Sequence, residues 1–136
     1  MEYVIPGPPI PLHRARASKH GFYDSQYQAK KNIKWYFSKT YSEVELHNCP
    51  ISITITFHMP IPKSTSKKKY AKLLSSPHIK IPDIDNNLKF IFDTFNGILW
   101  EDDSLIYEVH AKKVYSENPR TVFKIAKYEE PNEKST

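Results

Sequence analysis

The sequence is short of several features that define whole classes of protein. It has one cysteine, Cys49, among 136 residues, which excludes an internal disulfide and a metal site built from cysteines. No apolar run approaches the roughly 20 residues of a membrane span, and residues 1–11 lack the apolar core of a signal peptide. Internal repeats and low-complexity linkers are also absent. We therefore expect a soluble cytoplasmic protein with no membrane partner.

Charge is unevenly distributed in this chain. The 20 Lys and Arg residues against 15 Asp and Glu give a net charge of +5. Basic residues fill segments 13–39 and 63–80, whereas the acids cluster at 83–108 and in the C-terminal tail. A positive field suggests a polyanionic partner, of which nucleic acid is the most common. The 39% of hydrophobic residues suffices for one modest core, so we expect one domain over 1–128 and a flexible tail over 129–136.

Hydrophobic periodicity predicts an α+β fold. Residues 51–57 alternate strictly between apolar and polar, which is typical of a half-buried strand. A second pattern follows the spacing of a buried helical stripe, with Asp83 as its N-cap and Asn96-Gly97 at its C-terminus. The residues of that stripe are Ile84, Leu88, Ile91, Phe92, Phe95 and Leu99. We also expect helices over 25–40 and 67–74, and strands over 2–5, 105–115 and 120–127.

Two local signals refine these expectations. Asp24 or Ser25 can cap the helix over 25–40, because short polar side chains accept hydrogen bonds from the first turn. Residues 117–119 separate the last two strands and have the composition of a hairpin loop. The basic residues 13–21 are expected in a loop or an edge hairpin.

Segment 82–104, PDIDNNLKFIFDTFNGILWEDDS, contains five aspartates and one glutamate. Asp83 and Asp85 stand at the predicted helix entry, and Lys89 lies one turn after Asp85 on the same face. Asp102 and Asp103 follow the helix, and one of them can approach the helix start if the connection folds back. Converging carboxylates suit Mg²⁺, a hard cation that takes oxygen ligands. Such a site, with a nearby lysine, can cleave a phosphodiester.

Each acid also has an ordinary structural interpretation. Asp83 suits a helix N-cap, where the helix dipole favours negative charge. Asp85 and Lys89 can form a surface ion pair of small energetic value. Asp93 can be a solvated helix residue or the partner of a lysine, and Asp102 and Asp103 have the composition of a turn. The residues alone leave both interpretations open.

The acidic segment resembles the central motif of the RusA-type Holliday junction resolvases. In that pattern an aspartate and one spacer precede Asp-Asn, a lysine follows on the same helix, and Asp-Asp comes after Trp and one spacer. Residues 83–89 and 100–103 contain all of these parts. Segment VIPGPPIPLHRARAS resembles the Pro-rich, basic opening of the family, and KKVYSENPRTVFKI resembles its closing hairpin. The resemblance covers most of residues 3–127.

The resemblance implies a Mg²⁺-dependent endodeoxyribonuclease, with Mn²⁺ as a substitute, that binds four-way DNA junctions and resolves them by paired nicks in recombination and repair. It implies a homodimer of α+β domains, each with a mixed β-sheet packed with two main helices. By position, Asp83, Asp85 and Asp103 would bind the metal, with Asp102 as the rival of Asp103. Lys89 would be needed for cleavage. A bacterial gene of phage or prophage origin is expected.

Other residues acquire roles in this interpretation. Asn86 matches the motif and would support the acids from behind. The basic residues expected to contact DNA phosphates are Arg14, Arg16, Lys19, Lys67, Lys68 and Lys69. Trp100 is expected to be a core anchor, and His78 is a weak candidate for a base because metal-bound water needs no separate one.

Two alternatives stay open. In the first, the chain is a non-catalytic DNA-binding or regulatory module, whose acids serve only as caps and turns. In the second, it is a metal-dependent nuclease of another kind, acting on other branched DNA or built on a Pro-Asp…Asp/Glu-x-Lys pattern. Pro82-Asp83 is present, but Glu108-Val109-His110 places histidine where that pattern requires lysine.

Overall fold

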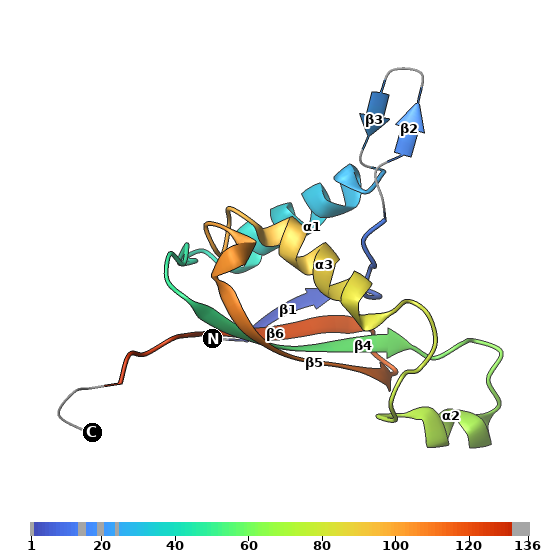
Figure 1. Ribbon diagram of the computed structural model, residues 1–136. Helices are drawn as coiled ribbons and strands as arrows, with labels where there is room; N and C mark the ends of the chain where they lie inside the picture. The colour runs from blue at the N-terminus through green and yellow to red at the C-terminus, as the bar shows by residue number, and fades with distance from the viewer. Residues whose placement is uncertain (1, 14–15, 19–20, 24, 132–136) are drawn as a thin grey trace.

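The computed structural model describes residues 2–13, 16–18, 21–23 and 25–131 (Figure 1). Its centre is a four-stranded sheet in the order β1-β6-β4-β5. The strands are β1 (Glu2–Pro6), β4 (Ile51–Pro60), β5 (Ile106–Ser116) and β6 (Arg120–Lys127). β4 pairs in parallel with β5 and antiparallel with β6, so the sheet is mixed. The expected α+β fold with a mixed sheet is confirmed.

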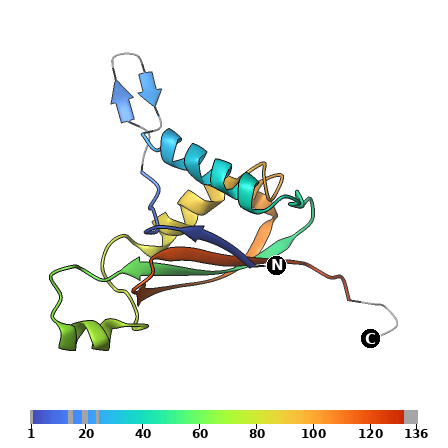
Figure 2. The ribbon, with the colours of Figure 1, turned by 180° about the vertical axis from the view of Figure 1, so that it is seen from behind.

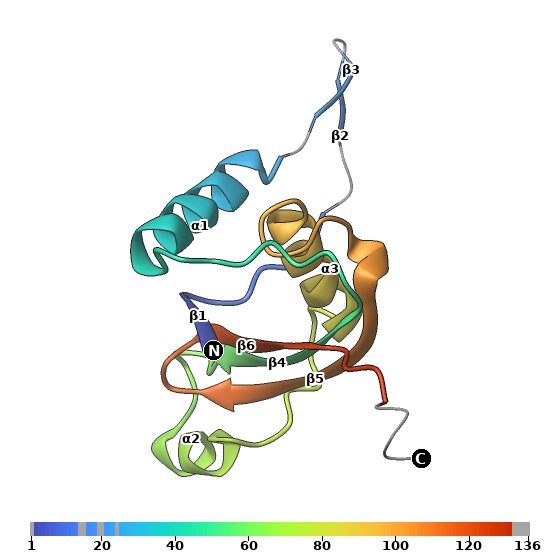
Figure 3. The same cartoon turned by 90° about the vertical axis from the view of Figure 1, so that its left-hand side faces the viewer.

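The helices lie on different sides of this sheet. α1 (Tyr27–Thr40) and α3 (Ile84–Phe95) cover one face, and α2 (Lys67–Leu73) lies on the opposite side (Figures 1 and 3). β2 (Arg16–Ser18) and β3 (Gly21–Tyr23) form a separate hairpin that projects beyond the start of α1 (Figure 2). A 3₁₀ turn, η1 (Asp103–Leu105), precedes β5. No helix in the described part of the chain is long and apolar enough to cross a membrane.

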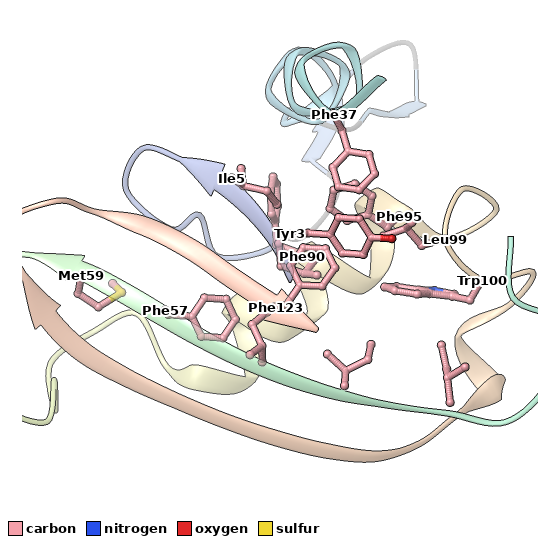
Figure 4. Packing of buried hydrophobic residues seen from close by; sticks show 14 residues of the cluster. Tyr3, Ile5, Phe37, Phe57, Met59, Phe90, Phe95, Leu99, Trp100 and Phe123 are labelled. Carbon is pink, nitrogen blue, oxygen red and sulfur yellow. The ribbon is translucent and has the colours of Figure 1, made fainter. Parts of the chain in front are cut away.

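The core lies between the sheet and the two helices above it. The strand predicted over 51–57 is confirmed, and every second side chain from Ile51 to Met59 is at most 3% exposed. Phe57 and Phe123 rise from the sheet toward Phe90 and Phe95 of α3 (Figure 4). Burying one such side chain contributes about 1.5–3 kcal/mol. β4 and α3 are therefore fixed relative to each other.

The buried face of α3 is rotated from the predicted stripe. Its buried residues are Asn87, Phe90, Ile91, Thr94 and Phe95, whereas Ile84, Leu88 and Phe92 are only partly buried. Thr94 can be buried because its hydroxyl donates to the Phe90 carbonyl at 2.7 Å. The predicted end of the helix is confirmed, since Gly97 adopts a φ of 81° directly after Asn96.

The expected hairpin between the last two strands is wrong. β5 and β6 do not pair with each other, because β4 lies between them. Residues 117–119 must therefore cross the end of β4, a span of about 10 Å between the outer strands. β4 pairs along its length with β5 on one side and β6 on the other, which places its inward apolar side chains in the middle of the core.

The predicted cap of α1 is also different. Gln26 occupies the N-cap position without a side-chain cap bond. Its side chain instead accepts a hydrogen bond from the His13 backbone N–H at 2.8 Å and donates to the Pro11 carbonyl at 2.7 Å. These bonds attach the Pro-rich segment to the start of α1. Asp24 lies outside the described residues.

Candidate metal centre

The first group of predicted site residues lies at the start of α3. Asp83 is the N-cap, and its carboxylate makes no capping bond, although its carbonyl accepts from the Asn86 and Asn87 backbone N–H groups. Asp85 Oδ2 lies 3.7 Å from Lys89 Nζ, and both side chains are more than 60% exposed. The two carboxylates are therefore accessible to solvent and to a cation.

The loop that leads to Asp83 is fixed by a lysine from β5. Lys113 Nζ donates to the carbonyls of Lys80 and Pro82 at 2.8 and 2.5 Å. The backbone N–H of His78 donates in turn to the Lys113 carbonyl at 3.0 Å. These bonds attach the loop to the edge of the sheet. The position of Asp83 therefore depends on β5 as well as on α3.

His78 lies behind this loop rather than among the acids. Its side chain is 9% exposed, and its ring lies 4.8 Å from the Tyr115 ring, centroid to centroid. Burial, aided by the charge of Lys113, lowers the pKa of His78 below its ordinary value. The packing of a neutral imidazole against Tyr115 is a sufficient structural role for His78, and no catalytic role is needed to explain it.

Two neighbouring asparagines differ in environment. Asn86 is half-buried, and its carbonyl accepts from the Leu12 N–H at 2.9 Å, which holds the Pro-rich segment against the first turn of α3. Asn87 is fully buried, and neither polar atom of its side chain has a partner among the described residues. Buried amides are normally hydrogen-bonded, so Asn87 is an exception behind the acids.

The second acidic pair follows α3, in the turn that leads to β5. Asp102 Oδ2 accepts a hydrogen bond from the Ser104 backbone N–H at 3.0 Å. Hydrogen bonds from the Ser104 side chain and backbone hold the pKa of Asp102 below its ordinary value. Asp103 Oδ1 accepts from the indole Nε1 of Trp100 at 2.9 Å. Asp102 therefore organises the turn, and Asp103 is attached to a fully buried core residue.

The two acidic pairs lie at opposite ends of α3 (Figure 1). A helix of 12 residues is about 18 Å long. Trp100 keeps Asp103 at the far end, because its ring packs against Phe92 and its carbonyl accepts from the Gly97 N–H. Within one chain the connection does not fold back, so the condition under which Asp102 or Asp103 would approach the helix start is not met. No three acids, histidines or cysteines of the described residues form a metal-binding group.

Asp93 is not part of either pair. Its carboxylate forms an ion pair with Lys30 of α1, at 2.5 Å from the ammonium. Lys30 is 7% exposed, so this contact joins the two helices. Of the two interpretations of Asp93, a solvated residue or the partner of a lysine, the structure supports the second.

The predicted DNA-contacting lysines lie on α2. Lys67, Lys68 and Lys69 form its first turn and are all exposed. α2 lies at the same end of the sheet as the first turn of α3 (Figures 1 and 2). Arg14 and Lys19 lie outside the described residues, as does the side chain of Arg16, the first residue of β2.

Sequence reasoning missed three residues that support the site. They are Lys113, which holds the loop before Asp83, the buried Asn87, and Trp100 in its second role as a donor to Asp103. The Asn86-Asn87 doublet was a usable signal, because position 87 falls on the same helix face as Ile91. No local pattern marks Lys113, since its partners are 31 and 33 residues away.

The comparisons with known proteins agree with these motifs. The family described as endodeoxyribonuclease RusA matches residues 6–126. This chain belongs to the RusA endodeoxyribonuclease family, which implies a hydrolase that cuts within DNA strands. A protein of Bacillus subtilis (strain 168), described as uncharacterized protein YqaN, is 32% identical over 130 residues, covering 88% of this chain and 91% of that protein.

Proposed function

We propose that this protein is a Mg²⁺-dependent endonuclease that resolves four-way DNA junctions by paired nicks, in DNA recombination and repair. The observation that carries the proposal is the family match over residues 6–126, together with exposed acids at the positions of the family motif. Mn²⁺ would substitute for Mg²⁺. A bacterial host and a phage or prophage origin belong to the same proposal.

The residues at the start of α3 fit a magnesium ion. Mg²⁺ in nucleases is typically held by one or two carboxylates together with substrate phosphates, and Asp83 and Asp85 are both exposed. When bound, the ion supplies an activated water and neutralises charge on the phosphate. Lys89 would place its ammonium beside the same phosphate, where it stabilises developing negative charge. Asn86 and Lys113 would position the acids.

We further propose that a homodimer completes the site. Asp103 lies about one helix length from Asp85 within a chain, so a third carboxylate at this site would come from another copy. If two copies place their α3 helices antiparallel about a twofold axis, the start of each helix meets the end of the other. Asp103 of one copy, or its neighbour Asp102, would then join Asp83 and Asp85 of the other. Two such sites would nick two strands symmetrically.

The second candidate is a non-catalytic DNA-binding module. The observation that favours it is the separation of the acids within one chain. In that case Asp83 and Asp102 serve only at the N-cap positions of α3 and η1, where the carboxylate of Asp102, but not that of Asp83, accepts a capping hydrogen bond. This candidate predicts DNA binding without cleavage.

The test is incubation of the purified protein with Mg²⁺ and a synthetic mobile four-way junction, with a linear duplex of the same sequence as control. We expect symmetrical nicks in the junction alone. Asp85→Asn should lower the cleavage rate by about 100-fold or more, because it removes a ligand of the metal ion that would stabilise transition-state charge. Cleavage of the duplex at an equal rate would indicate a different nuclease.

The matched control is Glu101→Gln. Glu101 is an exposed acid in the same segment, and no site role is assigned to it, so its loss should leave cleavage unchanged. Tight junction binding by the wild-type protein without any nicks would favour the non-catalytic module.

A further inference from the structure

The outer face of α1 carries an alternating row of aromatic and basic residues. Tyr27, Lys31, Trp35 and Lys39 are spaced by four, so they line one side of the helix. Lys31 Nζ lies 5.8 Å from the Tyr27 ring centroid, and Lys39 Nζ lies 6.0 Å from that of Trp35. We call these four residues, with Lys34, the α1 row.

The aromatic rings of the α1 row are exposed to an unusual extent. Tyr27 is 64% exposed and Trp35 is 65% exposed, whereas the second tryptophan, Trp100, is completely buried. Cation–π contacts of this kind at an exposed site contribute about 0.5–1 kcal/mol. That gain is small compared with the free-energy cost of leaving two large apolar rings in water. The cation–π contacts alone therefore do not explain why these rings are exposed.

The charged residues of the α1 row are all lysines. Residues 25–42 contain four lysines and no acid. No carboxylate among the described residues lies within ion-pair distance of Lys31, Lys34 or Lys39, whereas Lys30 pairs with Asp93. A hollow of about 310 Å³ opens beside the row, lined by Tyr27, Lys30, Lys31, Lys34 and Asp93. The α1 row thus combines aromatic surface with lysines that have no ion-pair partner among the described residues.

This chemistry favours a nucleic-acid strand over a second copy of the chain. Two copies that met through this face about a twofold axis would bring the lysines of both rows into one interface, with no acid of either row to neutralise them, which is unfavourable. A single strand, in contrast, offers phosphates for the ammonium groups and base faces for the rings. Tyr27 and Trp35 lie about 12 Å apart along the helix, or about three to four stacked bases.

We propose that the α1 row is a binding site for unpaired DNA, with Trp35 and Tyr27 stacked on bases and the lysines beside phosphates. The proposal rests on the proposed nuclease function for the choice of DNA as the nucleic acid. It assigns this binding to α1 and not to the acids of α3. Figures 1 and 3 place α1 beside α3 on the same face of the sheet, so a strand that leaves an opened junction can reach both helices.

The test measures the affinity of the full-length protein for a dye-labelled single-stranded oligothymidylate of about 12 nucleotides, a length within the range of known single-strand sites. Fluorescence anisotropy without divalent metal separates binding from cleavage. Trp35→Ala should weaken binding about tenfold, and Trp35→Phe, which keeps a ring, should restore most of it. Salt dependence is measured as the slope of log K, the logarithm of the binding constant, against the logarithm of the salt concentration. Replacing Lys31, Lys34 and Lys39 together should reduce the magnitude of this slope by about two.

The control is Tyr107→Ala, which removes an aromatic side chain of β5 that is 55% exposed and should leave the affinity unchanged. Equal affinities of Trp35→Ala and wild type, equal losses in Trp35→Ala and Tyr107→Ala, or no oligonucleotide binding by the wild type would each overturn the proposal. Junction cleavage by the same proteins is measured separately. If the affinity for the oligonucleotide depends on Trp35 but the junction is not cleaved, the nuclease function alone is overturned. If the junction is cleaved but the affinity does not depend on Trp35, the α1 site alone is overturned.

Discussion

At the residue scale, the acids of the site depend on side chains that are distant in sequence. Asp103 is attached to Trp100, and the segment before Asp83 is attached to Lys113 of β5. Lys113 is half-buried, and a charged donor that bonds to backbone carbonyls typically contributes about 1.5–3 kcal/mol. The placement of Asp83 is therefore a tertiary effect, although the N-cap position itself is local.

Lys113→Met tests this placement. Methionine keeps an unbranched apolar chain but cannot donate to the Lys80 and Pro82 carbonyls. We expect a loss of about 1–2 kcal/mol in the free energy of unfolding and a higher Mg²⁺ concentration for half-maximal junction cleavage. Urea unfolding and a Mg²⁺ titration of the cleavage rate measure the two effects.

Lys112→Met is the control for that variant. Lys112 is the exposed neighbour of Lys113 on β5, and its side chain points to the opposite face of the sheet. It should leave both the stability and the Mg²⁺ dependence nearly unchanged. Equal behaviour of the two variants would contradict the role given to Lys113.

At the element scale, α3 and its C-terminal turn set the distance between the two acidic pairs. Gly97 ends the helix with a φ of 81°, and its N–H donates to the Trp100 carbonyl at 2.7 Å. This turn directs the chain to Trp100 and so keeps Asp103 at the far end of α3. A Cβ added at Gly97 would meet no atom within 4 Å, so a substitution there is opposed by backbone strain alone.

Gly97→Ala should therefore destabilise the protein by about 1–2 kcal/mol, the cost of a left-handed conformation for alanine. Gly97→Asn should cost less, because asparagine adopts this conformation more readily. Thermal or urea unfolding of the two variants measures the difference. An alanine variant as stable as the wild type would show that the turn does not depend on this conformation.

Elements with a strong local pattern were predictable from the sequence, and their neighbours in space were not. The alternation of 51–57 and the Asn96-Gly97 end of α3 were both correct, because they depend on residues within a few positions. The order of the strands was not, since β4 enters between β5 and β6 from more than 50 residues away. The buried face of α3 was rotated because Asn87 and Thr94 are buried despite being polar.

The same limit applies to the candidate site. The expected helix carries Asp85 and Lys89, whereas the roles that the motif gives to these residues stay predictions. It did not predict where Asp103 lies, because that depends on the packing of Trp100 against Phe92. The spacing of residues along the sequence indicates which acids could bind a metal. The distance between the two acidic pairs, in contrast, is determined by the packing of the core.

At the scale of the whole molecule, the two acidic pairs of one chain lie about the length of α3 apart, and under the proposed function each pair is one half of a site. A complete site would therefore need two copies, with Asp83, Asp85 and Lys89 from one copy and Asp103 from the other. Two sites related by a twofold axis also match the symmetry of paired nicks in a four-way junction. This requirement makes the proposed dimer testable through activity.

The most direct test mixes two inactive variants. Asp85→Asn and Asp103→Asn are each expected to be inactive, because each removes one acid from both sites of its own dimer. After the variants are mixed and allowed to exchange subunits, a mixed dimer contains one site without either acid and one site with all acids intact. We predict that the mixture regains Mg²⁺-dependent nicking of a four-way junction, at single strands rather than in pairs. A mixture in which mixed dimers form but no nicks appear would contradict the shared site.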